Sequence, residues 1–129
     1  MLRFRLFGIP VGVHLTFLLI ALLGPRGGWD VVALWTAAVF VSILLHEMGH
    51  ALVARAFHAR GVSVTLYGLG GVTTYHHGEH GMTHFRSFVV SAAGSAVGIV
   101  LGGLVFLLDR QGVFDGVPFE VWVFGWAFV

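Results

Sequence analysis

The sequence predicts an all-α membrane protein, a multi-span helical bundle with a short cytoplasmic-side β element between the second and third spans. Of its 129 residues, 57% are hydrophobic and 10% are charged, whereas soluble domains carry about 25% charged residues. The mean hydropathy of +0.92 points the same way. Long apolar runs separated by short turns are the third observation, since a helix needs about 20 apolar residues to cross a bilayer.

We expect one membrane-embedded unit over residues 1–129, with spans at about 8–23, 31–57, 88–108 and 119–129. Glycine, proline and aspartate mark the turns at 24–30 and 109–118. The first apolar run lacks the small-residue cleavage site of a signal peptide, so we expect it to be retained. The fourth run is too short to cross, and we expect that span to be incomplete and the chain to be truncated.

An alternating pattern after the second span predicts the β element. Val62, Val64 and Leu66 alternate with polar residues, which is the period of a strand with one buried face. Glycines follow, and the VTTY sequence at 72–75 is expected to return as a second short strand.

The arginines predict the orientation, because cytoplasmic loops of membrane proteins carry an excess of basic residues. With the N-terminus in the cytoplasm, five of the seven arginines lie on that side: Arg3, Arg5, Arg55, Arg60 and Arg86. The expected location is therefore the cell membrane, multi-pass, with the N-terminus and segment 58–87 cytoplasmic and the lipid bilayer as a partner. A net charge of +1 gives no basic surface for nucleic acid, and the absence of cysteine excludes disulfides and thiolate zinc sites.

The second predicted span contains HEMGH, which puts three ionisable side chains into an apolar helix. His46 and His50 are four residues apart, so their side chains project from one helix face. Two such imidazoles can hold zinc, and Glu47 beside them can act as a general base. The alternative is a polar cluster that joins helices by hydrogen bonds, which explains this triplet less well. At about 1.5 Å per residue from Val31, the motif lies inside the membrane near its cytoplasmic face.

Three further segments accompany this motif: the glycine-rich GLGGVTTY after it, SAAGSAVGIVLGG in the third span, and the opening FGIPVGVHLTFLLIALL. Together with HEMGH, they resemble the site-2 protease family of intramembrane zinc metalloproteases. The resemblance covers nearly the whole chain, and HEMGH is its most specific part.

The resemblance implies one zinc ion held by His46 and His50, with Glu47 as the catalytic general base and proton shuttle. It implies regulated intramembrane proteolysis, in which the substrate is a transmembrane segment of another protein. A helix hides its peptide bonds, so we expect part of the substrate to unwind. The strand that carries Val62, Val64 and Leu66 is expected to bind the unwound part by β-augmentation.

The chain departs from the family pattern in two respects. Many members carry Ala-Gly-Pro-x-x-Asn in the third span, where Ser95 and Gly98 stand here at the proline and asparagine positions. The family takes its third zinc ligand from an aspartate on the next span, which we expect beyond Val129. A catalytic zinc site needs three protein ligands, so we expect residues 1–129 alone to be inactive.

The remaining histidines and glycines have simpler expected roles. His14 is expected to face the bundle with a hydrogen-bonded partner, or else to line the access path to the site. The histidine-rich loop at 75–85 is expected to be solvated rather than to bind metal. Gly94, Gly98 and Gly102 recur every four residues, as in closely packed membrane helices.

Two other functions stay open. One is a non-catalytic, truncated relative that serves as a membrane binding module. The other is a membrane metal transporter, which is less favoured because the third span, 88–108, has no ionisable residue that would extend an ion path. The identity of the substrate and the oligomeric state do not follow from the sequence.

Overall fold

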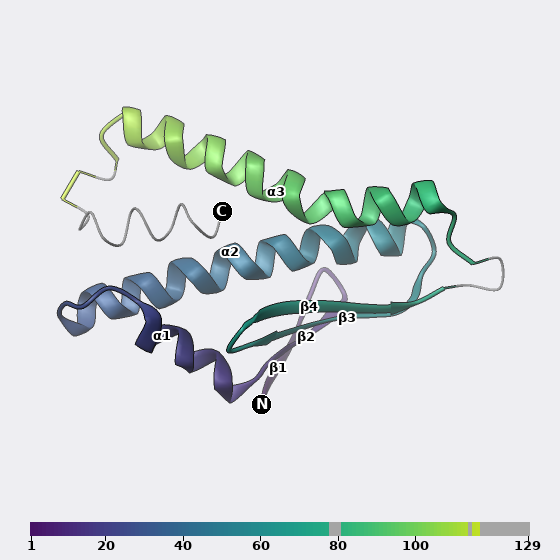
Figure 1. Cartoon of the computed structure of the whole chain (residues 1–129), viewed down its shortest axis with the longest axis horizontal. Coiled ribbons are helices and arrows are strands. Elements are labelled where there is room, and N and C mark those ends of the chain that lie inside the picture. Colours follow the sequence, from purple (N-terminus) through teal and green to yellow (C-terminus); the bar gives the residue numbers. More distant parts are fainter. Residues whose placement is uncertain (78–80, 114, 117–129) are drawn as a thin grey trace.

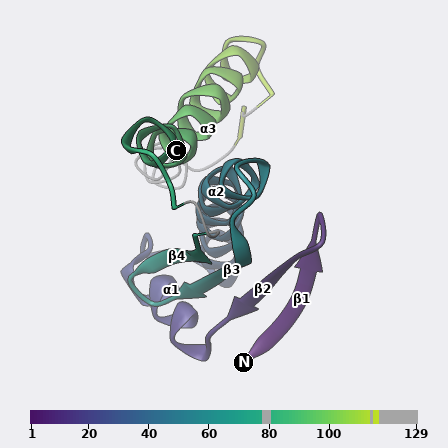
Figure 2. The ribbon, with the colours of Figure 1, turned by 90° about the vertical axis from the view of Figure 1, so that its right-hand side faces the viewer.

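The computed structural model describes residues 1–77, 81–113, 115 and 116. Its elements are β1 (Leu2–Leu6), β2 (Ile9–Val13), the 3₁₀ helix η1 (Leu15–Leu18), α1 (Leu19–Leu23), α2 (Trp29–Ala56), β3 (Arg60–Tyr67), β4 (Gly70–His76) and α3 (His84–Arg110). Helices α2 and α3 run antiparallel, and the sheet lies along the C-terminal half of α2 (Figure 1). Figure 2 shows that α2 is the middle layer, with α3 on one side and the sheet on the other.

Among the described residues, α2 and α3 are the two helices that are long and apolar enough to cross a membrane. Helix α2 ends in a Schellman motif, in which His58 takes a positive φ of 62° and the Ala59 N–H donates to the Ala54 carbonyl at 3.0 Å. Thr83 is the N-cap of helix α3, and its hydroxyl accepts a hydrogen bond from the Arg86 N–H at 3.2 Å. These local signals fix where α2 ends and where α3 begins.

The sheet has the order β1-β2-β3-β4 and is mixed. Strands β1 and β2 form one antiparallel hairpin, β3 and β4 form another, and a parallel pairing of β2 with β3 joins them. The first hairpin turns through Phe7 and Gly8, which have φ values of 51° and 79°, as a two-residue type I′ turn requires. The free edges of the sheet are therefore β1 and β4.

One face of the sheet packs against α2 and forms the core. Val11, Val64 and Leu66 are buried on this face, where their removal from water contributes about 1.5–3 kcal/mol each. They meet apolar side chains of α2, including Trp35, Val39, Ile43 and Met48. The sheet is thus held directly beneath the part of α2 that carries HEMGH.

The prediction of an all-α fold is wrong in its β content. The predicted strands at 62–66 and 72–75 are confirmed as β3 and β4, but residues 2–13 form a second hairpin that completes a four-stranded sheet. Backbone pairing with β3 and burial of Ile9 and Val11 favour this arrangement over a helix.

The predicted spans compare with the described elements as follows. Segments 31–57 and 88–108 correspond to α2 and α3. Segment 8–23 is not one long helix, because β2 takes its first part and leaves only the short η1 and α1. The predicted span at 119–129 lies outside the described residues.

Candidate metal centre and catalytic site

The HEMGH motif lies in the C-terminal half of α2, where α3 packs on one side and the sheet on the other. His46 and His50 are half-buried and face α3, whereas Glu47 is buried, with 8% of its surface exposed, and faces the sheet. Because a helix turns about 100° per residue, consecutive motif residues contact different neighbours.

The two imidazoles point at each other. Their Nε2 atoms are 3.1 Å apart, and the rings are nearly perpendicular with centroids 4.8 Å apart. The Nδ1 atom of His50 lies 2.7 Å from the backbone carbonyl oxygen of Val90 in α3. A carbonyl only accepts, so Nδ1 carries the proton and donates it, and the Nε2 atom of the neutral ring keeps a lone pair that faces the His46 Nε2. This tautomer is the one that ligates metal through Nε2.

The spacing of the imidazoles fits zinc. Two nitrogens at ~2.0–2.1 Å from a tetrahedral zinc ion lie about 3.3 Å apart, close to the 3.1 Å between the Nε2 atoms. Gly94 of α3 makes room for this pair, because a Cβ there would lie 2.3 Å from the His50 Nε2 and 2.8 Å from the His46 Nε2. Within the described part of the chain, no third histidine, cysteine, aspartate or glutamate joins them as a metal-binding group. The residues present therefore fit two of the corners that a zinc site needs.

The carboxylate of Glu47 is held from the opposite side by β4. The Thr73 hydroxyl lies 2.7 Å from Glu47 Oε2 and 3.0 Å from the Glu47 backbone oxygen, and it donates to these acceptors. Gly71 allows the close approach of the strand, since a Cβ there would lie 2.5 Å from Glu47 Cγ. A buried carboxylate with one fixed donor keeps its remaining lone pairs for another proton carrier.

A cavity of about 310 Å³ opens between β4 and α3 and reaches both parts of the motif. Its lining is made of Glu47, His50, Gly71, Val72, Thr73, Tyr75, Val90 and Ser91. The cavity therefore brings an imidazole of the motif, the Glu47 carboxylate and residues of the edge strand β4 into one space.

The predicted substrate strand does not have the position that β-augmentation needs. Val62, Val64 and Leu66 lie in β3, which pairs with β2 on one side and β4 on the other. Val64 and Leu66 are also fully buried against α2. Alternation identifies a strand but not its place in a sheet, and the edge that borders the cavity belongs to β4 instead.

The other predicted polar positions lie away from the motif. His14 is exposed, caps η1 and accepts a hydrogen bond from the Thr16 N–H at 3.2 Å, so its partner is local. In the loop, Glu79 and His80 lie outside the described residues. Three more loop histidines are exposed: His76, His77 and His84.

The glycine stripe packs α3 against α2 as predicted, and Gly94, Gly98 and Gly102 are buried. Gly49 inside the motif serves the same contact, because a Cβ there would lie 2.9 Å from the Ala93 carbonyl oxygen. The contact of Gly94 with both imidazoles was missed by sequence reasoning, which explained this stripe by helix packing alone. Gly71 and Thr73 were also missed as site residues, although both belong to the glycine-rich segment that supports the family resemblance.

The fold and the motif geometry define the class, and the chain belongs to peptidase family M50, the site-2 protease family. The family model "Peptidase family M50" matches residues 34–119, which include most of α2, the second hairpin and α3. This membership was predicted from the sequence and is confirmed.

Particular relatives are similar over part of their length. The chain is 34% identical to sll0528 of Synechocystis sp., with 74% of this chain covered and 29% of that protein. It is 33% identical to Rip3 of Mycobacterium tuberculosis, covering 75% of this chain and 28% of Rip3. It is 32% identical to "Zinc metalloprotease MJ0392" of Methanocaldococcus jannaschii, with 54% of this chain covered and 22% of that protein. The chain thus spans less than a third of the length of these curated relatives.

The fold also matches a solved structure, "Site-2 Protease from Methanocaldococcus jannaschii". The TM-score is 0.69 at 22% sequence identity, and the match covers 98% of this chain and 61% of the other. At this identity the likeness establishes the shared fold, including the sheet that sequence reasoning underestimated.

Proposed function

We propose that this chain forms the zinc-binding and base-carrying part of an intramembrane metalloprotease that cleaves transmembrane segments of other membrane proteins. The observation that carries the proposal is the motif geometry, with paired Nε2 atoms 3.1 Å apart and the Glu47 carboxylate bordering the same cavity. A non-catalytic binding module would have no need to hold His50 in the tautomer that leaves its Nε2 lone pair for a metal.

Each motif residue has a separate role in the proposal. His46 and His50 hold one zinc ion through Nε2, and a third ligand comes from outside the described residues. A bound zinc ion supplies Lewis acidity, which makes water a stronger nucleophile near neutral pH. Glu47 takes the proton of the attacking water and passes it to the leaving amine, and Thr73 keeps the carboxylate turned toward the cavity.

The free edge of β4 is the proposed binding site for the unwound substrate. Its residues Val72 and Tyr75 line the cavity beside Glu47, and an extended chain pairing with this edge would bring its backbone to the carboxylate. Main-chain hydrogen bonds give affinity without demanding a particular side chain. This edge replaces β3 as the site of β-augmentation.

We propose that α2 and α3 cross the membrane with the motif end toward the cytoplasm, following the arginine distribution. The chain has no cysteine, so single cysteines report position without background. Thr74→Cys should react with a membrane-impermeant maleimide from the cytoplasmic side, and Gln111→Cys from the opposite side. Reaction of Gln111→Cys from the cytoplasmic side alone would contradict this topology.

Cleavage of a reconstituted substrate tests the proposed function. A chain that continues through a further span, from which the third ligand is proposed to come, is purified into detergent with a reporter that has one transmembrane helix. We expect cleavage that a zinc chelator abolishes and added zinc restores, and no cleavage by residues 1–129 alone. Stoichiometric zinc without any cleavage would favour the non-catalytic binding module, whereas zinc uptake into proteoliposomes would favour transport.

A further inference from the structure

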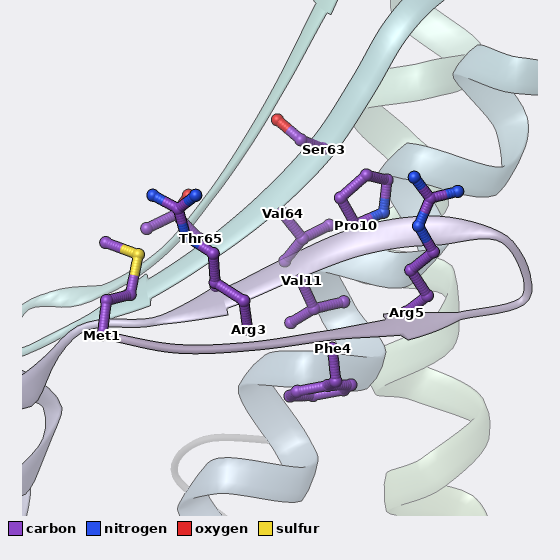
Figure 3. A pocket seen from close by; sticks show the side chains of 10 residues that line it. Met1, Arg3, Phe4, Arg5, Pro10, Val11, Ser63, Val64 and Thr65 are labelled. Atoms are coloured by element: carbon purple, nitrogen blue, oxygen red, sulfur yellow. The ribbon is translucent and has the colours of Figure 1, made fainter.

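A second hollow, of about 600 Å³, lies on the face of the sheet that points away from α2 (Figure 3). Strands β1, β2 and β3 form it, and the Arg3 and Arg5 side chains rise on one side of β1 while Phe4 points to the other. It is separate from the motif cavity, because the sheet itself lies between the two.

The sequence of β2 creates the hollow. Side chains alternate between the two faces of a strand, so Ile9 and Val11 enter the core and leave Pro10 and Gly12 on the outer face. A Cβ on Gly12 would meet the Met1 sulfur at 3.1 Å, so only a flexible side chain covers this floor. The small residues Pro10 and Gly12 on β2 thus leave a depression between the longer side chains of β1 and the side chains of β3.

These side chains of β1 and β3 carry charge and hydroxyl groups. Arg3 and Arg5 stand on β1, and Ser63 and Thr65 stand on β3, all lining the hollow. Neither guanidinium has a hydrogen-bond or ion-pair partner within the described ranges, and no acidic residue lines the hollow. Two guanidinium groups cannot face hydrocarbon without a large cost, so this face lies in water or among lipid headgroups.

The dimensions of the hollow limit its ligand. Residues two apart on a strand are about 6.7 Å apart, and β1 and β3 are separated by about 9.5 Å across β2. Guanidinium groups bind phosphate oxygens through paired N–H groups, and hydroxyls across the floor suit alcohol groups of the same ligand. A simple inorganic ion would engage the arginines alone, whereas a phosphate ester with a hydroxyl substituent can contact both the arginines on β1 and the hydroxyls on β3.

We propose that this hollow is a binding site for a phosphate ester that carries hydroxyl groups, with Arg3 and Arg5 on the phosphate and Thr65 on a hydroxyl. A lipid headgroup and a small soluble ester share this chemistry. The site is independent of the proposed protease function, because Arg3, Arg5 and Thr65, which would bind the ligand, stand on the sheet face that points away from the HEMGH motif.

Two titrations of the purified protein in uncharged detergent distinguish these sources. One uses sn-glycerol 3-phosphate and the other uses dihexanoyl phosphatidylglycerol, each followed by calorimetry. We expect saturable binding in at least one titration. Binding of glycerol phosphate indicates a soluble ester, and binding of the lipid alone indicates a headgroup.

Matched variants test whether the hollow itself binds. Arg3→Gln combined with Arg5→Gln removes the guanidinium groups, and Gly12→Val fills the floor while keeping every charge. Both should weaken binding about tenfold or more. The double arginine variant loses hydrogen bonds from charged groups, which are worth roughly that factor, and Gly12→Val occupies the space that the ligand needs. Arg26→Gln, in an exposed turn outside the hollow, loses one charge and should bind like the parent.

The proposal is overturned if neither ligand binds saturably, if Gly12→Val binds like the parent while remaining folded, or if Arg26→Gln weakens binding as much as the arginine variants. Thermal unfolding of each variant checks that it is folded. If Gly12→Val fails to fold, unchanged binding by the surface variant Arg3→Gln/Arg5→Gln still rejects the site.

Discussion

The HEMGH motif is held from two sides, and the two sides hold different groups. On one side, α3 contacts the imidazoles through the Val90 carbonyl and the backbone at Gly94. On the other side, β4 contacts the carboxylate through the Thr73 hydroxyl and the backbone at Gly71. An imidazole N–H needs an acceptor and a carboxylate needs a donor, so each side supplies what its group requires.

With the proposed roles of the motif residues, this difference means that separate elements serve metal binding and the positioning of the base. Each side uses one glycine for close approach and one hydrogen bond for orientation. Substitutions on the α3 side should therefore change zinc affinity, and substitutions on the β4 side should change turnover with zinc still bound. Three variants test this separation.

The largest effect is expected for Gly94→Ala. The added Cβ would lie 2.3 Å from the His50 Nε2, and the ring is tied to Val90 by its Nδ1, so the imidazoles must separate and lose their joint geometry. We expect zinc affinity to fall about 100-fold, as for other losses of groups that orient metal ligands. Competition with a fluorescent zinc chelator measures it.

Gly103→Ala is the matched control in the same helix, since a Cβ at that position meets nothing within 4 Å. It should bind zinc like the parent. Equal zinc loss in both variants would mean that α3 acts through general helix packing and not through the imidazoles.

An equally large effect, on cleavage and not on zinc affinity, is expected for Gly71→Ala on the β4 side. Its Cβ would lie 2.5 Å from Glu47 Cγ and 3.0 Å from Ile43 Cγ2, so the carboxylate must move within a packed layer. We expect cleavage to fall about 100-fold, at the lower end of what a general base contributes, while zinc content stays at one per chain. Loss of zinc here would break the separation between the two sides.

The smallest effect is expected for Thr73→Val, which keeps the shape of the side chain and removes the 2.7 Å hydrogen bond to Glu47. Turnover should fall about tenfold, because hydrogen bonds to charged groups contribute roughly 1.5–3 kcal/mol. Thr73→Ser should restore most of it. Thr74→Val, which changes the outer face of the same strand, should leave kcat unchanged, and an equal loss there would point to a general weakening of β4.

The sequence predicted the parts of this arrangement that depend on local spacing. His46 and His50 are one helical turn apart, and Val62, Val64 and Leu66 alternate, so the paired imidazoles and the second hairpin followed from pattern alone. The first hairpin carries the same signal, since Leu2, Phe4 and Leu6 alternate with arginines, but the long apolar run after it favoured a helix.

The parts that were missed depend on contacts between distant segments. Thr73 is 26 residues from Glu47, and Val90 is 40 residues from His50. Neither residue differs locally from its neighbours Thr74 and Val89, so nothing in the sequence marks which one turns inward. The order of the strands in the sheet could not be predicted for the same reason, because the parallel pairing of β2 with β3 joins segments separated by all of α2.

The central claim is that His46 and His50 hold zinc while Glu47 acts as the base. The most direct measurement is zinc content by elemental analysis, paired with cleavage of a membrane-embedded reporter, on purified Glu47→Gln and His50→Ala. We expect Glu47→Gln to keep one zinc and lose about 10³–10⁴-fold in turnover, and His50→Ala to lose the metal. Full activity in Glu47→Gln, or stoichiometric zinc in His50→Ala, would contradict the account.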